Sequence, residues 1–479
     1  VIDEANRCLQ CKKPMCQQGC PIHTPIPAMI KALKEGGLEE AGAMLFSNNP
    51  MSLVCSLVCN HERQCEGHCV LGRKGQPVHV SSIENYISDT CLERIDVRCQ
   101  PKNGKKVAVI GAGPAGITIA ILLTQKGYSV TIFDSRDKIG GVLQYGIPEF
   151  RLPKAILERY KKKLLSMGIR IRPNTTIGGA LEIKDLFRDG YESIFIGTGV
   201  WRPKKLGIKG ESLGNVHFAI DYLANPDAYD LGDRVAVIGV GNSAMDVART
   251  AVRLGTSEVT VIYRRSEKEM PAGKDEIIEA REEGVKLIAM ASPVEFLGAE
   301  GKVTGIHLVR RKETDYGSDG RRRTAHIPDS DFFLECDGIV TAINQDVDHQ
   351  VYRTTHVEVA KNGKLDIGRF TSETGESGVF AGGDVSPWGA NVVIHAIADG
   401  KKAAMKIDQY LGGKGELNMG EWFEIPEIAD IEVNEPHKRF PTRCLSVEER
   451  KDNFREVNCG FHKLDAMGEA LRCLHCDRR

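Results

Sequence analysis

One stretch, Val107–Gly116, constrains the fold of this chain more than any other. It reads VAVIGAGPAG, an apolar β-branched run that leads into a G-x-G-x-x-G turn, and the residues Ala115–Gln125 have a helical pattern. A strand, a tight turn and a helix in this order can hold a dinucleotide pyrophosphate on the helix N-terminus, where free N–H groups and the helix dipole favour negative charge. We therefore expect Gly111, Gly113 and Gly116 to form a dinucleotide-binding turn.

A carboxylate follows this turn at the expected distance. A second apolar strand, Val130–Phe133, ends in Asp134. An acid at this position accepts hydrogen bonds from the adenosine ribose hydroxyls of a bound dinucleotide. A glycine-rich turn without a ligand is the alternative, and the strand and acid that follow make it the weaker interpretation.

The same unit occurs a second time. The pentapeptide VAVIG recurs at Val235, and the sequence continues as VGNSAMDVARTAVRLG, a second turn and helix. The second turn holds Gly239, Gly241 and Asn242, with Ala244 near the place of the third glycine. We therefore expect an internal duplication of the dinucleotide-binding unit.

The two copies differ in the residues that read the ribose. The second strand of the second copy, Val259–Ile262, continues into Arg264 and Arg265, whereas the first copy ends in Asp134. Arginines bind a 2′-phosphate through charge-assisted hydrogen bonds, and a carboxylate would repel it. An arginine pair on a solvated strand end is the alternative, but the duplication favours a phosphate clamp. The sequence predicts FAD at the first turn and NADPH at the second.

A flavin-type segment returns near the end of the duplicated region. In the stretch Val379–Val385, VFAGGDV, an apolar run is followed by Gly383 and Asp384, and a helical stretch at Val392–Leu411 comes next. This arrangement can place the acid near the ribityl chain and a helix N-terminus near the isoalloxazine ring. The nicotinamide unit is then an insertion within the flavin unit, and the fold class is α/β with two dinucleotide-binding domains, as in the disulfide reductases.

The cysteines gather at the two ends of the chain. Of the 15 cysteines, ten precede residue 100 and four follow residue 440. The first group, Cys8, Cys11, Cys16 and Cys20, has the spacing C-x2-C-x4-C-x3-C-P, which is similar to the bacterial ferredoxin run, and the second is Cys55, Cys59, Cys65 and Cys69. Two 4Fe–4S clusters would follow from exchange of cysteines between these groups. Structural zinc is the alternative, since four thiolates at short spacing also suit a tetrahedral site.

Composition and spacing exclude several classes of function. The net charge of −1 gives no reason to expect nucleic acid or a membrane surface as a partner, and no apolar run approaches the length of a membrane span. The first residues do not resemble a signal peptide, so we expect a cytoplasmic protein, and Val1 indicates that residues precede it. Disulfide-reductase chemistry needs a cysteine pair beside the flavin, and Cys336 is alone between Lys105 and Arg443.

The chain is expected to divide into five segments. They are a mostly helical iron–sulfur domain (1–100) with a helical hairpin at Pro25–Ser47, the first part of the FAD domain (105–230), the NADP domain (231–344), the second part of the FAD domain (345–412) and a cysteine-containing extension (413–479). Cys91 and Cys99 are interpreted as ordinary thiols near the first boundary. In the extension, GEALRCLHC repeats DEANRCLQC at six of nine positions. Either a further metal site at Cys473 and Cys476 or a tail with incidental thiols would account for it.

Together these motifs resemble one family. The two cysteine groups, the first glycine turn, YGIPEFRLPK, the inserted unit with YRRSEKEMPA and AGGD look like the glutamate synthase small subunit family of NADPH- and FAD-dependent iron–sulfur oxidoreductases. The resemblance covers Cys8 to about Leu411. CEGHCVLGRKGQPV and SSIENYISD look closest to the large subunit of NADH-dependent ferredoxin:NADP oxidoreductase.

The resemblance implies ligands that spacing alone does not give. One cluster would be held by Cys8, Cys11, Cys16 and Cys69, and the other by Cys20, Cys59, Cys65 and Glu84, with Cys55 unligated. The implied FAD contacts are Gly111, Gly113, Gly116, Asp134, Gly141, Arg151, Asp384 and Asn391, and the implied NADP contacts are Gly241, Asn242, Arg264 and Arg265. Asp134 stands where glutamate is commoner in the family.

The function implied is electron transfer. A flavin takes two electrons as a hydride from NADPH and passes them singly to iron–sulfur clusters, so no catalytic side chain is predicted. The expected partner is a ferredoxin-like or second flavin and iron–sulfur subunit in a hetero-oligomer, and the direction of flow and flavin bifurcation stay open. The small subunit of glutamate synthase and a non-catalytic scaffold of a larger redox complex are the alternatives.

Overall fold

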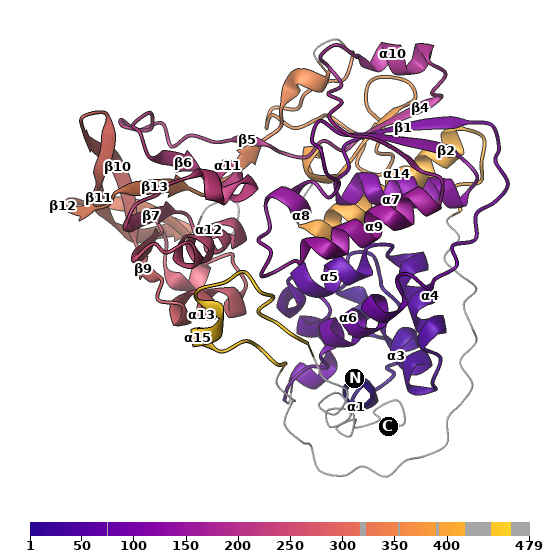
Figure 1. Ribbon diagram of the computed structural model, residues 1–479, viewed down its shortest axis with the longest axis horizontal. Coiled ribbons are helices and arrows are strands. Elements are labelled where there is room, and N and C mark those ends of the chain that lie inside the picture. Colours follow the sequence, from indigo (N-terminus) through magenta and orange to yellow (C-terminus); the bar gives the residue numbers. More distant parts are fainter. Residues whose placement is uncertain (74, 317–321, 353–354, 389–391, 417–441, 461–479) are drawn as a thin grey trace.

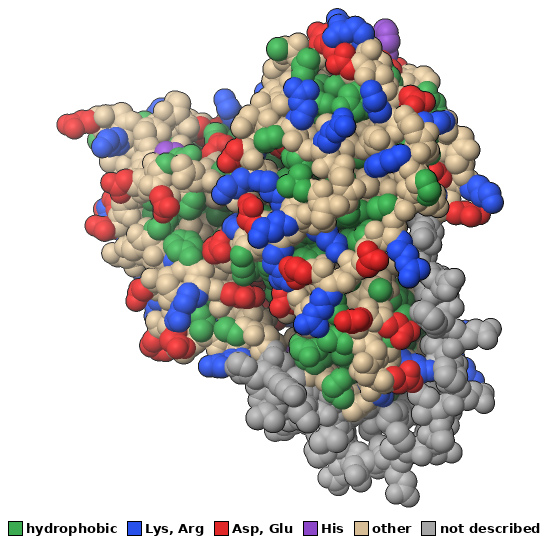
Figure 2. Space-filling view, turned by 45° about the vertical axis from the view of Figure 1, so that its right-hand side comes forward, with side chains coloured by type: hydrophobic (Ala, Val, Ile, Leu, Met, Phe, Trp, Pro, Cys, Tyr) green, Lys and Arg blue, Asp and Glu red, His purple; other side chains and the backbone are tan. Residues whose placement is uncertain are grey.

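The computed structural model describes residues 1–73, 75–316, 322–352, 355–388, 392–416 and 442–460. Figure 1 shows three bodies: a sheet with its helices, a second sheet with its helices beside it, and a set of N-terminal helices below the first. No helix in the described ranges combines the length and the apolar character that crossing a lipid bilayer requires. On the face shown in Figure 2, acidic and basic side chains are intermingled.

The first sheet is wholly parallel and carries the first glycine turn. It consists of β1 (Lys106–Ile110), β2 (Ser129–Phe133), β3 (Arg170–Arg172), β4 (Ser193–Ile196) and β15 (Val379–Ala381), in the order β15-β4-β1-β2-β3. Its helices are α7 (Pro114–Gln125), α8 (Val142–Tyr145), α9 (Lys154–Ser166), α10 (Ile183–Arg188) and α14 (Val393–Tyr410), with the 3₁₀ turns η6 (His349–Tyr352) and η7 (Gly383–Val385). The helices α7, α9 and α14 lie between this sheet and the N-terminal helices (Figure 1).

The second sheet is also wholly parallel. Its strands are β6 (Val216–Phe218), β7 (Arg234–Ile238), β8 (Glu258–Ile262), β9 (Lys286–Ile288) and β13 (Gly338–Thr341), in the order β6-β13-β7-β8-β9. Its helices are α11 (Ala219–Ala224), α12 (Asn242–Arg253) and α13 (Lys274–Glu282), with the turns η4 (Pro226–Ala228) and η5 (Glu267–Glu269). The strand β6 lies in the range 105–230 expected for the FAD domain, yet it pairs with β13.

The chain passes between the two sheets twice, at strands that pair with each other. β5 (Arg202–Pro203) and β14 (Gln345–Asp346) form a small antiparallel ribbon. The second unit is therefore inserted between β4 and β15 of the first, which confirms the predicted fold class. We propose that the inserted domain begins at β5, earlier than residue 231.

A three-stranded antiparallel sheet was not predicted from the sequence. The strands β10 (Ala291–Ala299), β11 (Lys302–Tyr316) and β12 (Arg322–Glu335) form a meander between β9 and β13. Its apolar side chains, among them Phe296, Ile306 and Leu308, pack with Ile238 and Ile339 of the second sheet. This meander extends the inserted unit without altering its parallel topology.

The N-terminal domain is helical, as predicted. It contains α1 (Ile2–Asn6), α2 (Met15–Gln18), α3 (Ile26–Lys34), α4 (Leu38–Asn48), α5 (Ser52–Val58) and α6 (Val80–Cys91), with η1 (His61–Arg63), η2 (Glu66–His68) and η3 (Val70–Arg73). The helices α3 and α4 confirm the expected hairpin. Cys91 is a free, buried thiol at the last residue of α6, and Cys99 is a free, exposed thiol in the segment that follows.

The N-terminal domain shares a hydrophobic core with the first dinucleotide unit. Met51 and Leu53 of the N-terminal domain are buried in the same cluster as Ile117 of α7 and Ile397 of α14. Burial of these apolar side chains in a shared core stabilises the contact between the two domains. The cysteine groups are therefore held at a fixed place beside the flavin-type unit.

Residues 442–460 of the C-terminal extension pack against the body of the protein. They contain α15 (Val447–Arg450), which lies beside α13 in Figure 1. The N–H of Val457 donates to the carbonyl of Phe150 at 3.1 Å, and Cys444 forms a β-bridge with Asn458. These residues therefore contact both dinucleotide units, since Arg450 also pairs with Glu282 of α13. The predicted metal site at Cys473 and Cys476 lies outside the described residues.

Candidate functional site

The first glycine turn has the geometry that a pyrophosphate requires. Gly111 has φ +106°, and a Cβ there would lie 2.4 Å from the carbonyl oxygen of Gly197. A Cβ on Gly116 would lie 1.9 Å from the carbonyl oxygen of Gly111, so this glycine allows α7 to approach β1. A Cβ on Gly113, the N-cap of α7, would meet nothing within 4 Å. The open space at Gly113 lies at a helix N-terminus and fits a phosphate.

The second turn repeats this arrangement. Gly239 has φ +125°, and a Cβ there would lie 2.4 Å from the carbonyl oxygen of Ala342. Gly241 is the N-cap of α12, and a Cβ on this residue would also meet nothing within 4 Å. Asn242 opens the helix, and its Oδ1 accepts a hydrogen bond from the N–H of Gly273 at 3.3 Å. Both turns therefore leave room for a phosphate at a helix N-terminus.

A single cavity of about 610 Å³ is bordered by all three parts of the molecule. The first unit contributes the first glycine turn and Gly141, and α14 contributes Val393 and Ala396. The inserted unit contributes Asn242 and Asp246 of α12. The N-terminal domain contributes Val58 and Asn60, on either side of Cys59. Two ring systems in this cavity could therefore meet beside a cysteine of the second group.

Two predicted carboxylates line the cavity. Asp134 accepts hydrogen bonds from the N–H groups of Ala112 (2.6 Å) and Arg136 (2.8 Å), which fix its orientation, and burial raises its pKa. Burial also raises the pKa of Asp384 to about 6, against the opposing effect of Lys364. The N–H of Gly383 is held by Asp399 at 3.1 Å. The segment Gly383–Asp384 therefore borders the cavity, and its contact with a flavin stays a prediction.

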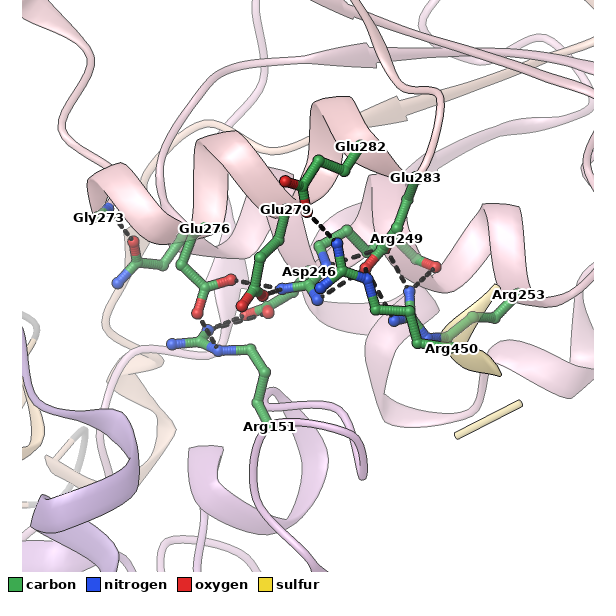
Figure 3. A network of polar contacts seen from close by, with 11 residues as sticks. Arg151, Asp246, Arg249, Arg253, Gly273, Glu276, Glu279, Glu282, Glu283 and Arg450 are labelled. Atoms are coloured by element: carbon green, nitrogen blue, oxygen red, sulfur yellow. Dashed lines mark hydrogen bonds and ion pairs between the residues drawn. The ribbon is translucent and has the colours of Figure 1, made fainter. Parts of the chain in front are cut away.

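Arg151 borders the cavity but is engaged in ion pairs. Its guanidinium donates two hydrogen bonds of 2.9 Å to the carboxylate of Asp246 and lies 2.7 Å from an oxygen of Glu276. Figure 3 shows Arg151 reaching from the first unit to α12 and α13. The structure therefore places the predicted flavin contact Arg151 in a bridge between the two dinucleotide units.

This bridge belongs to a larger buried network that the sequence did not indicate (Figure 3). Arg249 pairs with Glu276, Glu279 and Glu283, and its guanidinium carbon lies 4.8 Å from the ring centroid of Phe150. Arg450 of the C-terminal extension pairs with Glu282 and Glu283. The network ties both dinucleotide units and the extension together.

The predicted phosphate clamp lies at the carboxyl end of β8. Arg264 is exposed and Arg265 is half-buried, and within the described ranges no carboxylate pairs with either. A third arginine, Arg311 of β11, is close enough to Arg264 for repulsion to lower its pKa, after the larger effect of burial. The carbonyl of Met290 accepts from the N–H of Arg311, and the N–H of Met290 donates to the carbonyl of Arg265. Sequence reasoning missed Arg311, because only the fold brings this residue of β11 near the segment that follows β8.

Four predicted cysteine ligands lie around one cavity. Cys8, Cys11, Cys16 and Cys69 line an apolar space together with Ile26, Ile30, Val78 and Val80. Burial raises the pKa of Cys16 to about 12, and the neighbouring thiols of Cys69 and Cys11 contribute to this rise. Thiolates at these positions therefore need a positively charged partner, which a metal centre supplies.

The second predicted set also lies together. Glu84 is buried in α6, and its carboxylate contributes to raising the pKa values of Cys20, Cys59 and Cys65. Burial raises the pKa of Glu84 itself to about 8, and the nearby carboxylate of Glu66 adds to the effect. A metal centre would favour the charged form of this carboxylate. The unassigned Cys55 contacts Cys59 as a hydrogen-bond partner.

A four-iron cluster and a single zinc ion differ in how closely their ligands must converge. In the part of the chain that the structure describes, no three His, Cys, Asp or Glu side chains converge closely enough to hold one ion. Four thiolates around one zinc ion must each lie at about 2.3 Å from it. Ligands of a four-iron cluster surround a larger cubic core. Of the other predicted site residues, Asn391 lies outside the described residues.

Comparison with known proteins gives two family matches. Residues 1–95 match the family described as dihydropyrimidine dehydrogenase domain II, 4Fe-4S cluster. Residues 105–400 match the family described as pyridine nucleotide-disulphide oxidoreductase, and residues 76–185 give a second match to it. Together these matches cover the helical domain and both dinucleotide units.

Similar proteins include subunits of several oxidoreductases. The chain is 35% identical to the beta subunit of an NADP(+)-dependent formate dehydrogenase from Moorella thermoacetica, over 97% of this chain and 70% of that protein. It is 35% identical to the small chain of glutamate synthase (NADPH) from Escherichia coli, over 85% of this chain and 91% of that protein. It is 34% identical to the beta subunit of an NADPH-Fe(3+) oxidoreductase from Geobacter sulfurreducens, over 97% of this chain and 75% of that protein.

Among solved structures, Mycobacterium tuberculosis FprA in complex with NADPH is similar in fold. The TM-score is 0.56 at 18% sequence identity, and the match covers 65% of this chain and 85% of that one. At this identity the match supports the two-unit fold described above.

Proposed function

Because the chain belongs to the glutamate synthase small-subunit family of NADPH-dependent FAD and iron–sulfur oxidoreductases, we propose that it joins two kinds of electron transfer. It exchanges a hydride between NADP(H) and FAD, and it passes electrons singly through two 4Fe–4S clusters to or from a partner subunit. When bound, the flavin supplies the step between electron pairs and single electrons.

One observation carries this proposal. The cavity of about 610 Å³ is bordered by the first glycine turn, by Asn242 of the second and by the residues that flank Cys59. A flavin and a nicotinamide held there would lie next to each other and next to the second cysteine set. With the flavin, the nicotinamide and the second cysteine set all adjoining one cavity, the distances for electron transfer between them would be short.

Specific residues of this chain would hold each group. The first turn (Gly111, Gly113, Gly116) and Asp134, with Gly141, Arg151, Gly383, Asp384 and Asn391, would hold FAD. The second turn (Gly239, Gly241, Asn242) would hold the NADPH pyrophosphate, and Arg264, Arg265 and Arg311 its 2′-phosphate. Cys8, Cys11, Cys16 and Cys69 would hold one cluster, and Cys20, Cys59, Cys65 and Glu84 the other.

The partner is proposed to be a second redox subunit, ferredoxin-like or a flavin and iron–sulfur protein, as in ferredoxin:NADP oxidoreductase. Two of the similar proteins are beta subunits that align with 97% of this chain, whereas the glutamate synthase small chain aligns with 85%. The additional coverage supports a beta-subunit role over a glutamate synthase role, in which the partner would be a glutamine-dependent subunit. Purification of the native complex and identification of its other subunits distinguishes the two.

We expect the purified protein to be yellow-brown and its flavin to be reduced by NADPH. Anaerobic addition of NADPH should bleach the flavin absorbance within a single stopped-flow mixing, because a nicotinamide and a flavin held in this cavity would lie next to each other. A flavin that stays oxidised in the presence of excess NADPH would overturn the hydride-transfer assignment and favour a scaffold role.

Alanine at Gly113 or at Gly241 should weaken binding of one dinucleotide and leave binding of the other unchanged. In Gly113→Ala the new methyl group meets no protein atom within 4 Å, so the fold is kept, but it occupies the space expected for the FAD pyrophosphate. We expect flavin content to fall about tenfold or more in Gly113→Ala, as one misplaced methyl group opposes a phosphate contact worth roughly 1.5–3 kcal/mol. Gly241→Ala is the matched control: it should keep its flavin and lose NADPH binding. Equal flavin content in the two variants would contradict the assignment of the turns.

A further inference from the structure

Lys401 is a buried cation on the helix that connects the two electron-transfer sites. Its helix, α14, borders the central cavity with Val393 and Ala396. Lys401 follows five residues after Ala396, which is about 7.5 Å along a helix axis. The side of α14 that carries Lys401 faces the N-terminal domain, and the residue is 8% exposed.

A chain of hydrogen bonds leads from Lys401 to Cys20. The Nζ of Lys401 donates to the carbonyl oxygen and to the Oδ1 of Asn48, both at 2.6 Å. The Nδ2 of Asn48 donates to the Oγ1 of Thr24 at 3.4 Å, and this hydroxyl lies 3.3 Å from the Sγ of Cys20. All four residues are buried.

The charge of Lys401 is not neutralised by an acidic neighbour. Across the described ranges no carboxylate forms an ion pair with Lys401, and its two hydrogen-bond acceptors are amide oxygens. A buried ammonium without a counter-ion is costly, since charge is poorly solvated in a protein interior. Burial lowers the pKa of Lys401 to about 8, and the nearby thiolate of Cys20 opposes this effect.

We propose that Lys401 is a positioning residue that raises the reduction potential of the cluster bound by Cys20. Reduction adds one electron and no proton, so the reduced cluster is more negative by one charge than the oxidised cluster. A buried cation stabilises the more negative state, and this effect is strong where the dielectric is low. Polarisation of Thr24 and Asn48 carries the same effect to the sulfur through hydrogen bonds. The inference rests on the proposed function, because it takes Cys20 as a cluster ligand.

A redox titration of the full, cluster-loaded chain tests this inference. The chain is reduced stepwise with dithionite under anaerobic conditions, and the reduced clusters are counted by electron paramagnetic resonance. Lys401→Met removes the charge, Lys401→Arg keeps it, and Lys406→Met makes the same change five residues further along α14, where the lysine contacts Gln409. The component that disappears in Cys20→Ala identifies the cluster in question.

We expect the reduction potential of the cluster bound by Cys20 to be lower in Lys401→Met than in wild type, and to be unchanged in Lys401→Arg and Lys406→Met. The reduction potential of the other cluster should be unchanged in all three variants. If Lys401→Met fails to assemble the cluster, Lys401→Gln, which retains a donor to Asn48, should show the same shift. An unshifted component in the charge-free variant, or an equal shift in Lys406→Met, would overturn the inference alone. Absence of any reducible cluster in the wild-type protein would overturn the proposed function and the inference with it.

Discussion

Replacement of both Arg264 and Arg265 by alanine is expected to abolish the preference of this protein for NADPH over NADH. Charge-assisted hydrogen bonds to a phosphate contribute about 1.5–3 kcal/mol each, and screening at this exposed strand end favours the lower value. Loss of two such contacts should lower kcat/KM for NADPH by about 100-fold or more. The kcat/KM for NADH should change little, because NADH has no 2′-phosphate.

Two single variants test whether the loss in kcat/KM for NADPH is specific to the phosphate clamp or follows from removal of any nearby positive charge. Arg311→Gln should give a smaller loss, because the guanidinium of Arg311 also donates to Thr324 and Ser292. Arg310→Ala is the control: Arg310 is the neighbouring arginine on β11, and it lies 4.2 Å from the ring centroid of Phe332. An unchanged NADPH:NADH ratio in the double variant, or an equal loss with both nucleotides, would rule out the clamp.

The second large effect is on stability and comes from Glu283. Its carboxylate is fully buried and accepts hydrogen bonds from Arg249 (2.9 and 3.0 Å) and Arg253 (2.7 and 3.1 Å), and it forms an ion pair with Arg450 at 3.2 Å. Glu283→Gln keeps the shape but leaves three guanidinium groups without this counter-ion. Removal of one partner from a buried ion pair costs about 3–5 kcal/mol. We expect a loss of this size in the free energy of unfolding, measured by urea denaturation.

Glu267→Gln provides the matched control for Glu283→Gln. Glu267 pairs with Arg281 at the surface, where both side chains are about half exposed, and such pairs contribute about 0–1 kcal/mol. Burial opposes ionisation of Glu283, but hydrogen bonds from Arg253 and Arg249 outweigh it and hold its pKa below the usual range. Its stabilising effect is therefore full above the unfolded pKa of about 4.3 and is lost as the pH falls through the folded value. The free energy of unfolding should therefore differ less between wild type and Glu283→Gln as the pH falls. A difference in the free energy of unfolding that stays constant down to pH 3 would contradict this account.

The parts of the fold that were predictable are those set by local backbone sterics. Gly111 and Gly239 both need positive φ, and Gly116 lies where a Cβ cannot fit. These requirements act within one strand, turn and helix, so they are visible in the sequence as fixed glycine spacing. The duplication and the insertion followed from finding the same unit twice.

The parts that were not predictable depend on contacts between distant segments. Arg151 pairs with Asp246 and Glu276, and Arg450 reaches Glu283, across 95 and more residues of chain. Nothing in the spacing of these residues indicates that they meet, because charged residues at such positions are usually solvated. Glu84 is a similar case: its proximity to Cys20, Cys59 and Cys65 depends on how α6 packs, and only the family resemblance indicated it.

The central claim is that electrons from NADPH reach iron–sulfur clusters through a flavin in this chain. The most direct test is to add NADPH anaerobically to the purified full chain, after metal and flavin analysis, and to record the electron paramagnetic resonance spectrum. We predict iron and flavin in the protein and the signal of a reduced 4Fe–4S cluster, with no such signal in Gly241→Ala. Zinc in place of iron, or a flavin that is reduced while iron centres competent for reduction by dithionite stay oxidised, would contradict it.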